Sequence, residues 1–245
     1  MVLALGLLSA ASNCAFLFRA LSGSQLDPLN SFISELEVPG QPDSSVFRWA
    51  SLLSAVLTVV FAAGLFLRLP RGRPGVNGCG ALALFGAAGV VDALIPMDCA
   101  PSASVMCLRT QEGPTSWLDS AHTWFDAIGT LALLASLWLL GRHLRPHRDW
   151  RAVAAVGRTG FRWLTAVSGV VTVMSLRYSP GLGVAQRLQV LAISGWLVVL
   201  AIGQARQQLP QAMEDGGRWA QNREEEPASP HGGAASDVHH GVRPG

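Results

Sequence analysis

The stretch that decides the fold is FRWASLLSAVLTVVFAAGLFL, residues 47–67. It is an almost uninterrupted apolar run whose one charge is Arg48. A run of about 20 apolar residues has the length to cross the hydrocarbon core of a bilayer as a helix. A helix also satisfies its own backbone hydrogen bonds, which no open strand can do in lipid. The stretch therefore predicts a transmembrane helix.

Similar apolar segments recur along the chain at approximately 2–20, 79–96, 121–141, 159–176 and 187–205. The chain is 50% hydrophobic and only 14% charged, whereas a soluble domain is about 25% charged. The opening segment lacks the positive start and the cleavage site of a signal peptide, so we interpret it as the first span. We predict an all-α polytopic membrane protein in which residues 1–206 form a bundle of six transmembrane helices.

The arginines predict how this bundle is oriented. All 18 basic residues are arginine, and most lie in alternate segments at 68–78, at 142–162 and from 206 onward. Positive residues stay on the cytoplasmic side. We therefore expect a bacterial plasma-membrane protein with both termini cytoplasmic and with 21–46, 97–120 and 177–186 outside.

The tail and the charge pattern limit the partners that we expect. Residues 207–245 are rich in Pro, Gly, Glu and Ser, which predicts a disordered cytoplasmic tail. His239 and His240 are interpreted as solvated residues of that tail, because a metal site needs clustered ligands of defined geometry. No basic stripe is interleaved with aromatic residues, so we predict membrane lipids and no nucleic acid as partners.

The first outer segment contains DPLNSFISELEVPGQP, residues 27–42. Pro28 near its start is typical of the first turn of a short helix, which we place in the membrane interface. Ser34 and Glu35 stand among apolar neighbours. Two interpretations remain open. Glu35 faces water, as most carboxylates do, or Ser34 and Glu35 turn inward and line a cavity.

Ionisable residues also occur inside the predicted spans. His122 and Asp126 are four residues apart, so they share one helical face, and the histidine is the natural partner of the acid. Ionisable groups within spans are functional candidates because they are costly to bury unpaired. For this pair a functional role and a structural one stay open, whereas we expect Asp92 in the third segment to tie helices together.

The segment PMDCAPSASVMC, residues 96–107, holds two cysteines. Seven residues separate Cys99 from Cys107, whereas paired zinc ligands are separated by two to four. The segment is predicted to lie outside, where disulfides persist. We therefore predict a Cys99–Cys107 disulfide and neither a metal nor a cofactor. Asp98 would then be held at the end of the third span.

Arg187 opens the last span on the side that has few arginines. We expect it to have a fixed partner, and the candidates are Glu35, Asp98 and an anionic lipid head group.

Three motifs resemble, in order, those of a bacterial integral membrane family that is common in actinobacteria and is catalogued as domain of unknown function 998. The likeness covers residues 1–206, and its motifs are LNSFISEL, PMDCAPS with a later cysteine and SW–AHTW, and GLGVAQRLQV. It implies a bundle of six or seven helices without an established activity. Ser34, Asp98, Cys107, Ser116 and His122 are among the matching residues. Asp119 replaces a histidine that family members often carry, so a two-histidine metal site is not implied here.

These residues define a candidate polar pocket at the outer ends of the spans, made of Ser34, Glu35, Asp98, His122, Asp126 and Arg187. The preferred interpretation is a non-enzymatic binder or transport accessory for a lipid or small molecule. One alternative is an intramembrane lipid hydrolase with an acidic and histidine site. His143 and His147 fall on the cytoplasmic side, which excludes three-histidine zinc chemistry. The other alternative is a proton-coupled transporter that uses His122, Asp126 and Asp92 as a relay.

Overall fold

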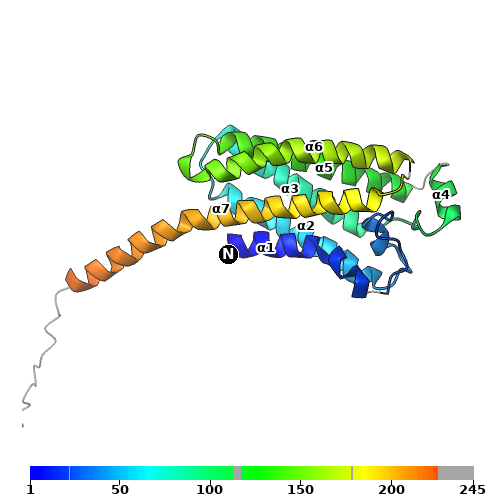
Figure 1. The fold of residues 1–245 in the computed structure, drawn as a ribbon. Helices are drawn as coiled ribbons and strands as arrows, with labels where there is room; N and C mark the ends of the chain where they lie inside the picture. Colours follow the sequence, from blue (N-terminus) through cyan, green and yellow to red (C-terminus); the bar gives the residue numbers. More distant parts are fainter. Residues whose placement is uncertain (22, 113–116, 178, 226–245) are drawn as a thin grey trace, which may run out of the picture. The chain divides into compact units, whose positions relative to one another are not determined.

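The computed structural model describes residues 1–21, 23–112, 117–177 and 179–225 (Figure 1). The chain divides into two units, Met1–Gln207 and Gln208–Gly245. The packing described below concerns the first unit. Every regular element in the described residues is a helix, so the predicted all-α class is confirmed.

The main helices follow the predicted segments. The described α-helices are α1 (Val2–Asn13), α2 (Ser44–Phe66), α3 (Arg73–Leu94), α4 (Val105–Glu112), α5 (Trp117–His143), α6 (Arg151–Arg177) and α7 (Leu182–Glu225). Short 3-10 helices are η1 (Ala15–Leu21), η2 (Ser34–Glu37) and η3 (Arg148–Trp150). The α-helix of the first segment ends at Asn13 rather than near residue 20, and α4 was not predicted. The first outer segment contains the short helix η2, but it begins at Ser34 and not at Pro28, which lies in a turn.

Five of these helices are long and apolar enough to cross a membrane: Val2–Arg19, Ser44–Phe66, Arg73–Leu94, Ser120–His143 and Leu182–Gln207. The protein is therefore a helical membrane protein, but the predicted count of six spans exceeds this finding by one. The difference is α6, which has the required length. Arg158 and Arg162 lower its hydropathy, together with the threonines of its middle part.

Six long helices nevertheless pack as one closed bundle. α1 lies against α2, α2 against α3, α3 against α5, and α5 against α6, as Figure 1 shows. α7 closes the ring on both sides. The Gln189 amide on α7 donates to Ser168 on α6 at 2.9 Å, and the Asn13 amide at the end of α1 donates to Ser194 on α7 at 3.0 Å. The core between them is rich in leucine and includes Phe61, Leu82, Leu133, Leu137, Leu140, Leu197 and Leu200.

Small residues bring neighbouring helices close together. Ser9 on α1 and Thr58 on α2 share a hydrogen bond of 2.7 Å between their hydroxyls, and Ser9 and Ser54 each donate to the other's carbonyl. Gly157 on α6 lies directly on Gly141 of α5, so a methyl group at residue 157 would stand 3.1 Å from the Gly141 Cα. Close approach of this kind replaces the hydrophobic driving force that lipid cannot supply.

The two ends of the bundle differ in construction. We call residues 15–43 and 95–112 the cap. Its apolar cluster includes Phe16, Leu26, Leu36 and Val38, which pack with Phe47 of α2. We call residues 67–73 and 142–162, with Arg206, the arginine-rich end. There the His143 ring lies 2.8 Å from the Pro70 carbonyl. Val2 packs near Gly64 in the last turn of α2, and Gln207 reaches the Asp149 carbonyl, so both lie at this end.

The tail differs in part from the prediction of disorder. α7 continues as a helix to Glu225, where the sequence offers the helix formers Gln, Ala, Met, Glu and Arg. Residues 226–245, which contain His239 and His240, lie outside the described residues, so disorder there stays a prediction.

Candidate functional site

A disulfide closes one wall of the cap. Cys99 and Cys107 are bonded, with their Cα atoms 6.0 Å apart, which confirms the predicted bridge. The bonded segment turns tightly and leads into α4. Asp98, directly before it, is exposed. The bridge therefore holds the loop that follows the third span, but it does not turn Asp98 inward.

Glu35 is the most deeply buried carboxylate of the cap, with 0% of its surface exposed. One carboxylate oxygen accepts the Phe32 N–H at 3.0 Å. The other accepts the Ser102 N–H at 3.1 Å and the Ser102 hydroxyl. Burial raises the pKa of Glu35 above its ordinary value of 4.5, and these hydrogen bonds and the charge of Arg187 oppose that rise. Glu35 therefore links η2 to the disulfide-closed loop. Of the two interpretations of its orientation, the inward one holds for this residue.

A cavity of about 310 Å³ lies beside Glu35. Its lining is Asn30, Phe32, Glu35, Pro101, Ser102, Ala103, Ser104, Val105 and Leu182. Five of these residues, 101–105, fall between the two bonded cysteines. Among the described residues of the lining, the carboxyl of Glu35 is the one ionisable group, and the other walls are largely apolar. This cavity, which we call the cap cavity, suits a small amphipathic ligand or part of a lipid.

The start of α7 holds the first outer segment in place. The Asn30 side chain accepts the Gly181 N–H at 2.8 Å, and the Gln186 side chain accepts the Ile33 N–H at 2.7 Å. Arg187 donates to the carbonyls of Ser31 and Gly183, at 3.0 and 2.9 Å. The fixed partners of Arg187 are therefore backbone carbonyls. Neither predicted carboxylate bonds it directly, although Glu35 is near enough to feel its charge.

Gly183 permits this close approach. A methyl group at residue 183 would stand 2.5 Å from the Pro28 carbonyl and 2.7 Å from the Ser31 carbonyl. Both atoms belong to the backbone and cannot move aside cheaply. The segments LNSFISEL and GLGVAQRLQV thus form one structural unit, and Ser102 joins the PMDCAPS segment to it through Glu35.

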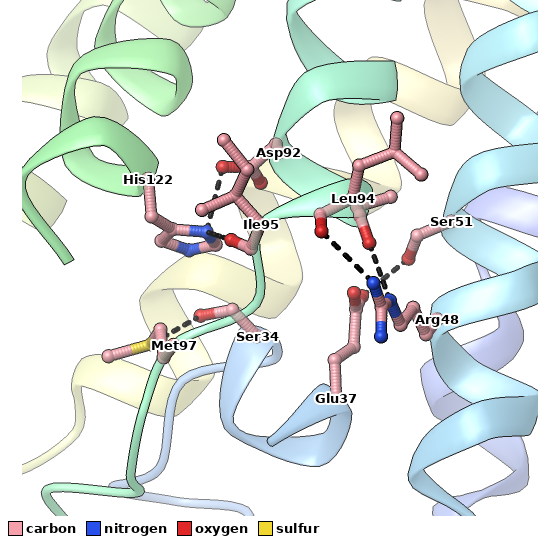
Figure 2. A network of polar contacts seen from close by, with 10 residues as sticks. Ser34, Glu37, Arg48, Ser51, Asp92, Leu94, Ile95, Met97 and His122 are labelled. Carbon is pink, nitrogen blue, oxygen red and sulfur yellow. Dashed lines mark hydrogen bonds and ion pairs between the residues drawn. The ribbon is translucent and has the colours of Figure 1, made fainter. Parts of the chain in front are cut away.

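A second polar group surrounds the end of α3 (Figure 2). Arg48 on α2 donates to the carbonyls of Ala93 and Leu94, at 2.8 and 3.0 Å. His122 on α5 lies with Nδ1 2.9 Å from the Asp92 carboxylate and 3.1 Å from the Ile95 carbonyl. The last carbonyls of a helix lack intrahelical partners and carry partial negative charge. Two side chains that can be cationic therefore stabilise the end of α3.

The partner of His122 differs from the one that the sequence predicts. The spacing indicates Asp126, one turn along the same helix, but the contact is with Asp92 on α3. The side chain of Asp126 is exposed on the surface of α5. The i,i+4 spacing relates residues within a single helix. The contact of the His122 ring depends instead on α3, the helix against which α5 packs. Asp92 is expected to tie helices together, and its contact with His122 joins α3 to α5.

Glu37 and Ser34 point away from Glu35. The Glu37 carboxylate accepts the Ser51 hydroxyl of α2 at 2.5 Å. Burial raises the pKa of Glu37 from 4.5 to about 7, and its hydrogen bond with Ser51 opposes that rise. The Ser34 hydroxyl donates to the Met97 sulfur at 3.4 Å. Successive residues of a 3-10 helix project about 120° apart, so adjacent polar residues of η2 serve different neighbours.

The predicted pocket residues are thus divided among several sites. Glu35 lines the cap cavity and Arg187 lies behind it, whereas His122 belongs to the group around the end of α3. Ser34 contacts Met97 instead, and Asp98 and Asp126 are exposed. Ser116, one of the motif residues, lies outside the described residues. Sequence reasoning missed Arg48 and Glu37. Arg48 carried a signal in the sequence, because it lies, like Arg187, at the outer end of a predicted span, on the side where arginines are few.

The described residues also lack the ligand set of a metal site. No group of three or more His, Cys, Asp and Glu side chains among them is placed to hold a metal ion. His122 and His143 stand near opposite ends of α5, about 30 Å apart along the helix axis. The residues of the hydrolase interpretation are Glu35, Asp98 and His122. Glu35 bonds Ser102, His122 contacts Asp92, and Asp98 is exposed.

Comparison with known proteins places the chain in a family. A family model described as "Protein of unknown function (DUF998)" matches residues 2–203. No curated protein and no solved structure matches the chain. Because the matched range covers the whole bundle, including all three motifs, the chain belongs to the DUF998 family of proteins of unknown function.

Proposed function

We propose that this membrane protein is a non-enzymatic binder or transport accessory that holds a lipid or small molecule in the cap cavity. The observation that carries the proposal is the cavity of about 310 Å³ beside the fully buried Glu35. A carboxylate accepts about four hydrogen bonds, and Glu35 accepts three. It retains one acceptor position for a hydroxyl or amine of the ligand.

The same proposal includes an orientation. Val2 and Gln207 lie at the arginine-rich end, which supports a cytoplasmic location for that end by the positive-inside rule. The cap then faces outward from the plasma membrane of a bacterium, where its disulfide persists. A reporter fused after Arg206 should be active only in the cytoplasm, and activity outside would reverse the orientation.

Ligand binding is tested by filling the cavity. The protein and an Ala103→Trp variant are purified from the native membrane, and co-purifying molecules are identified by mass spectrometry. Ala103 lines the cavity, so the indole should displace the ligand. Met106→Trp is the matched control, because Met106 is 72% exposed and does not line the cavity. The proposal would be contradicted if no co-purifying molecule were lost selectively from Ala103→Trp, or if the unmodified protein retained none.

One observation favours a second candidate, proton-coupled transport. The contact between His122 and Asp92 joins two spans at 2.9 Å, and such intramembrane pairs occur in proton relays. Proton uptake into proteoliposomes would support this candidate if Asp92→Asn abolished it and Ala103→Trp did not. Uptake that survives Asp92→Asn would exclude the relay.

A further inference from the structure

The arginine-rich end carries a dense basic surface outside the site described above. Its arginines between residues 142 and 162 are Arg142, Arg145, Arg148, Arg151, Arg158 and Arg162. Arg158 is half-buried and the others are exposed. The one acidic residue of the same segment is Asp149. Within this segment, six arginines therefore stand against one carboxylate.

Three of these arginines form a stripe on α6. Arg151, Arg158 and Arg162 are seven and four residues apart, so they share one helical face. None of them forms a hydrogen bond or ion pair within the described part of the chain. Arg162 lies about 16 Å along the axis from Arg151, which is well inside a helix of spanning length. An ionised side chain at that depth is costly unless an anion accompanies it.

The neighbouring face of α5 continues the stripe. A methyl group at Gly141 of α5 would stand 3.4 Å from the Arg158 side chain and 3.2 Å from its backbone nitrogen, so Arg158 crosses α5 there. Trp138 is 48% exposed, and its ring lies 5.3 Å from that of Phe161 on α6. Arg142 follows Trp138 by four residues, on the same face of α5. Trp138, Arg142, Arg158 and Arg162 therefore form one surface, which we call the basic patch.

We propose that the basic patch binds the phosphate head group of an anionic phospholipid, and that this lipid completes α6 as the sixth membrane-spanning helix. Guanidinium groups bind phosphate through paired hydrogen bonds. Their long stems reach from the apolar region to the depth of the head groups, and tryptophan is enriched at that depth. The site is independent of the cap cavity, which lies at the other end of the bundle.

Charge complementarity favours an anionic lipid as the ligand of the basic patch. From residue 150 to residue 207 the chain has no Asp or Glu, so α6 and the spanning part of α7 cannot neutralise the stripe themselves. The leaflet beside an arginine-rich membrane face carries anionic lipids. The same lipid explains how α6, which has the length of a spanning helix, lies in the bundle although it falls short of the hydropathy of a spanning helix.

The test compares lipids and variants. The purified protein is placed in nanodiscs of phosphatidylcholine alone or of equal parts of phosphatidylcholine and phosphatidylglycerol, and retained lipid is counted by native mass spectrometry. The unmodified protein should retain phosphatidylglycerol selectively. Arg158→Gln with Arg162→Gln should weaken that retention roughly 30-fold, since each arginine contributes about fivefold near an anionic surface.

A matched control removes the same charge elsewhere at this end. Arg71→Gln with Arg73→Gln alters exposed residues at the start of α3 and should leave the selectivity intact. Equal losses in both double variants would reduce the effect to general surface charge and overturn the proposal. Equal retention of the two lipids by the unmodified protein would also overturn it. So would stoichiometric co-purification of an acidic membrane protein that depends on Arg158 and Arg162, which would assign the patch to a protein partner.

Discussion

The cap and the arginine-rich end differ in whether their charged side chains have partners within the protein. At the end of the bundle that adjoins the cap, Glu35, Arg48, Asp92 and His122 each contact a defined partner. At the arginine-rich end, Arg151, Arg158 and Arg162 have none within the described residues and lie at the surface. A buried charge must be satisfied by the protein itself, whereas a surface charge can be left to the solvent or the lipid. We infer that the first end is built to hold a defined conformation, and that the second is built to meet a membrane.

The largest expected effect comes from removing the buried carboxylate of the cap. Glu35→Ala leaves the N–H groups of Phe32 and Ser102 without their acceptor, which should cost about 3 kcal/mol of unfolding free energy. Thermal unfolding in detergent measures the loss. Asp43→Asn is the control, since that side chain is exposed and forms no cap hydrogen bond, so the change should alter stability by less than about 0.5 kcal/mol. Equal effects of the two changes would show that the cap does not depend on Glu35.

The disulfide should come second. Replacing Cys99 and Cys107 by serine opens a short loop, whose closure contributes about 2.5 kcal/mol in the chain-entropy description. Five residues of the cavity wall lie in that loop, so ligand retention should fall with stability. Alkylation of the unmodified protein without reductant should leave both thiols unlabelled. Rapid labelling of both would remove the bridge from the account.

The contact between His122 and Asp92 should have a smaller effect. A double-mutant cycle of His122→Ala and Asp92→Asn isolates the interaction, and we expect a coupling energy of about 1 kcal/mol, as for other polar contacts between membrane helices. The same cycle with His122→Ala and Asp126→Asn should give a clearly smaller value. A larger coupling to Asp126 would restore the pairing that the sequence spacing indicates.

The pH dependence of stability gives the subtlest contrast. The pKa of Glu37 is raised from 4.5 to about 7, so between these values the folded state keeps a proton that the unfolded state has lost. The unfolded state then binds fewer protons, and stability falls as pH rises from about 4.5 to about 7. Glu37→Gln should flatten this decline in melting temperature and leave only the part due to Glu35. An unchanged slope would mean that Glu37 titrates normally.

The sequence predicts the features of this molecule that depend on composition and local spacing. Helix positions follow from apolar runs because lipid permits no other open-ended element. The disulfide follows from the separation of Cys99 and Cys107 and from their position between spans. The main difference between the predicted and the observed fold concerns α6, which the sequence predicts to be a span. Its arginines lower its hydropathy below that of a spanning helix, although it still packs in the bundle.

The side-chain partners could not be predicted in the same way. His122 contacts Asp92 because α3 and α5 pack together, and no spacing rule within one helix contains that contact. Glu35 turns inward because Ser102, 67 residues later, supplies donors to it. In the sequence, Glu37 cannot be distinguished from other carboxylates of loops between helices. Its burial and its hydrogen bond with Ser51 of α2 are seen only in the structure. Such contacts between distant residues are properties of the packed bundle.

The most direct measurement combines both ends in one experiment. Mass spectrometry of the protein purified from its native membrane is carried out on the unmodified chain, on Ala103→Trp, and on Arg158→Gln with Arg162→Gln. We predict two distinct retained molecules: a cavity ligand lost only from Ala103→Trp, and an anionic phospholipid lost only from the arginine variant. Retention of the cavity ligand by Ala103→Trp, or loss of one and the same molecule from both variants, would contradict the account.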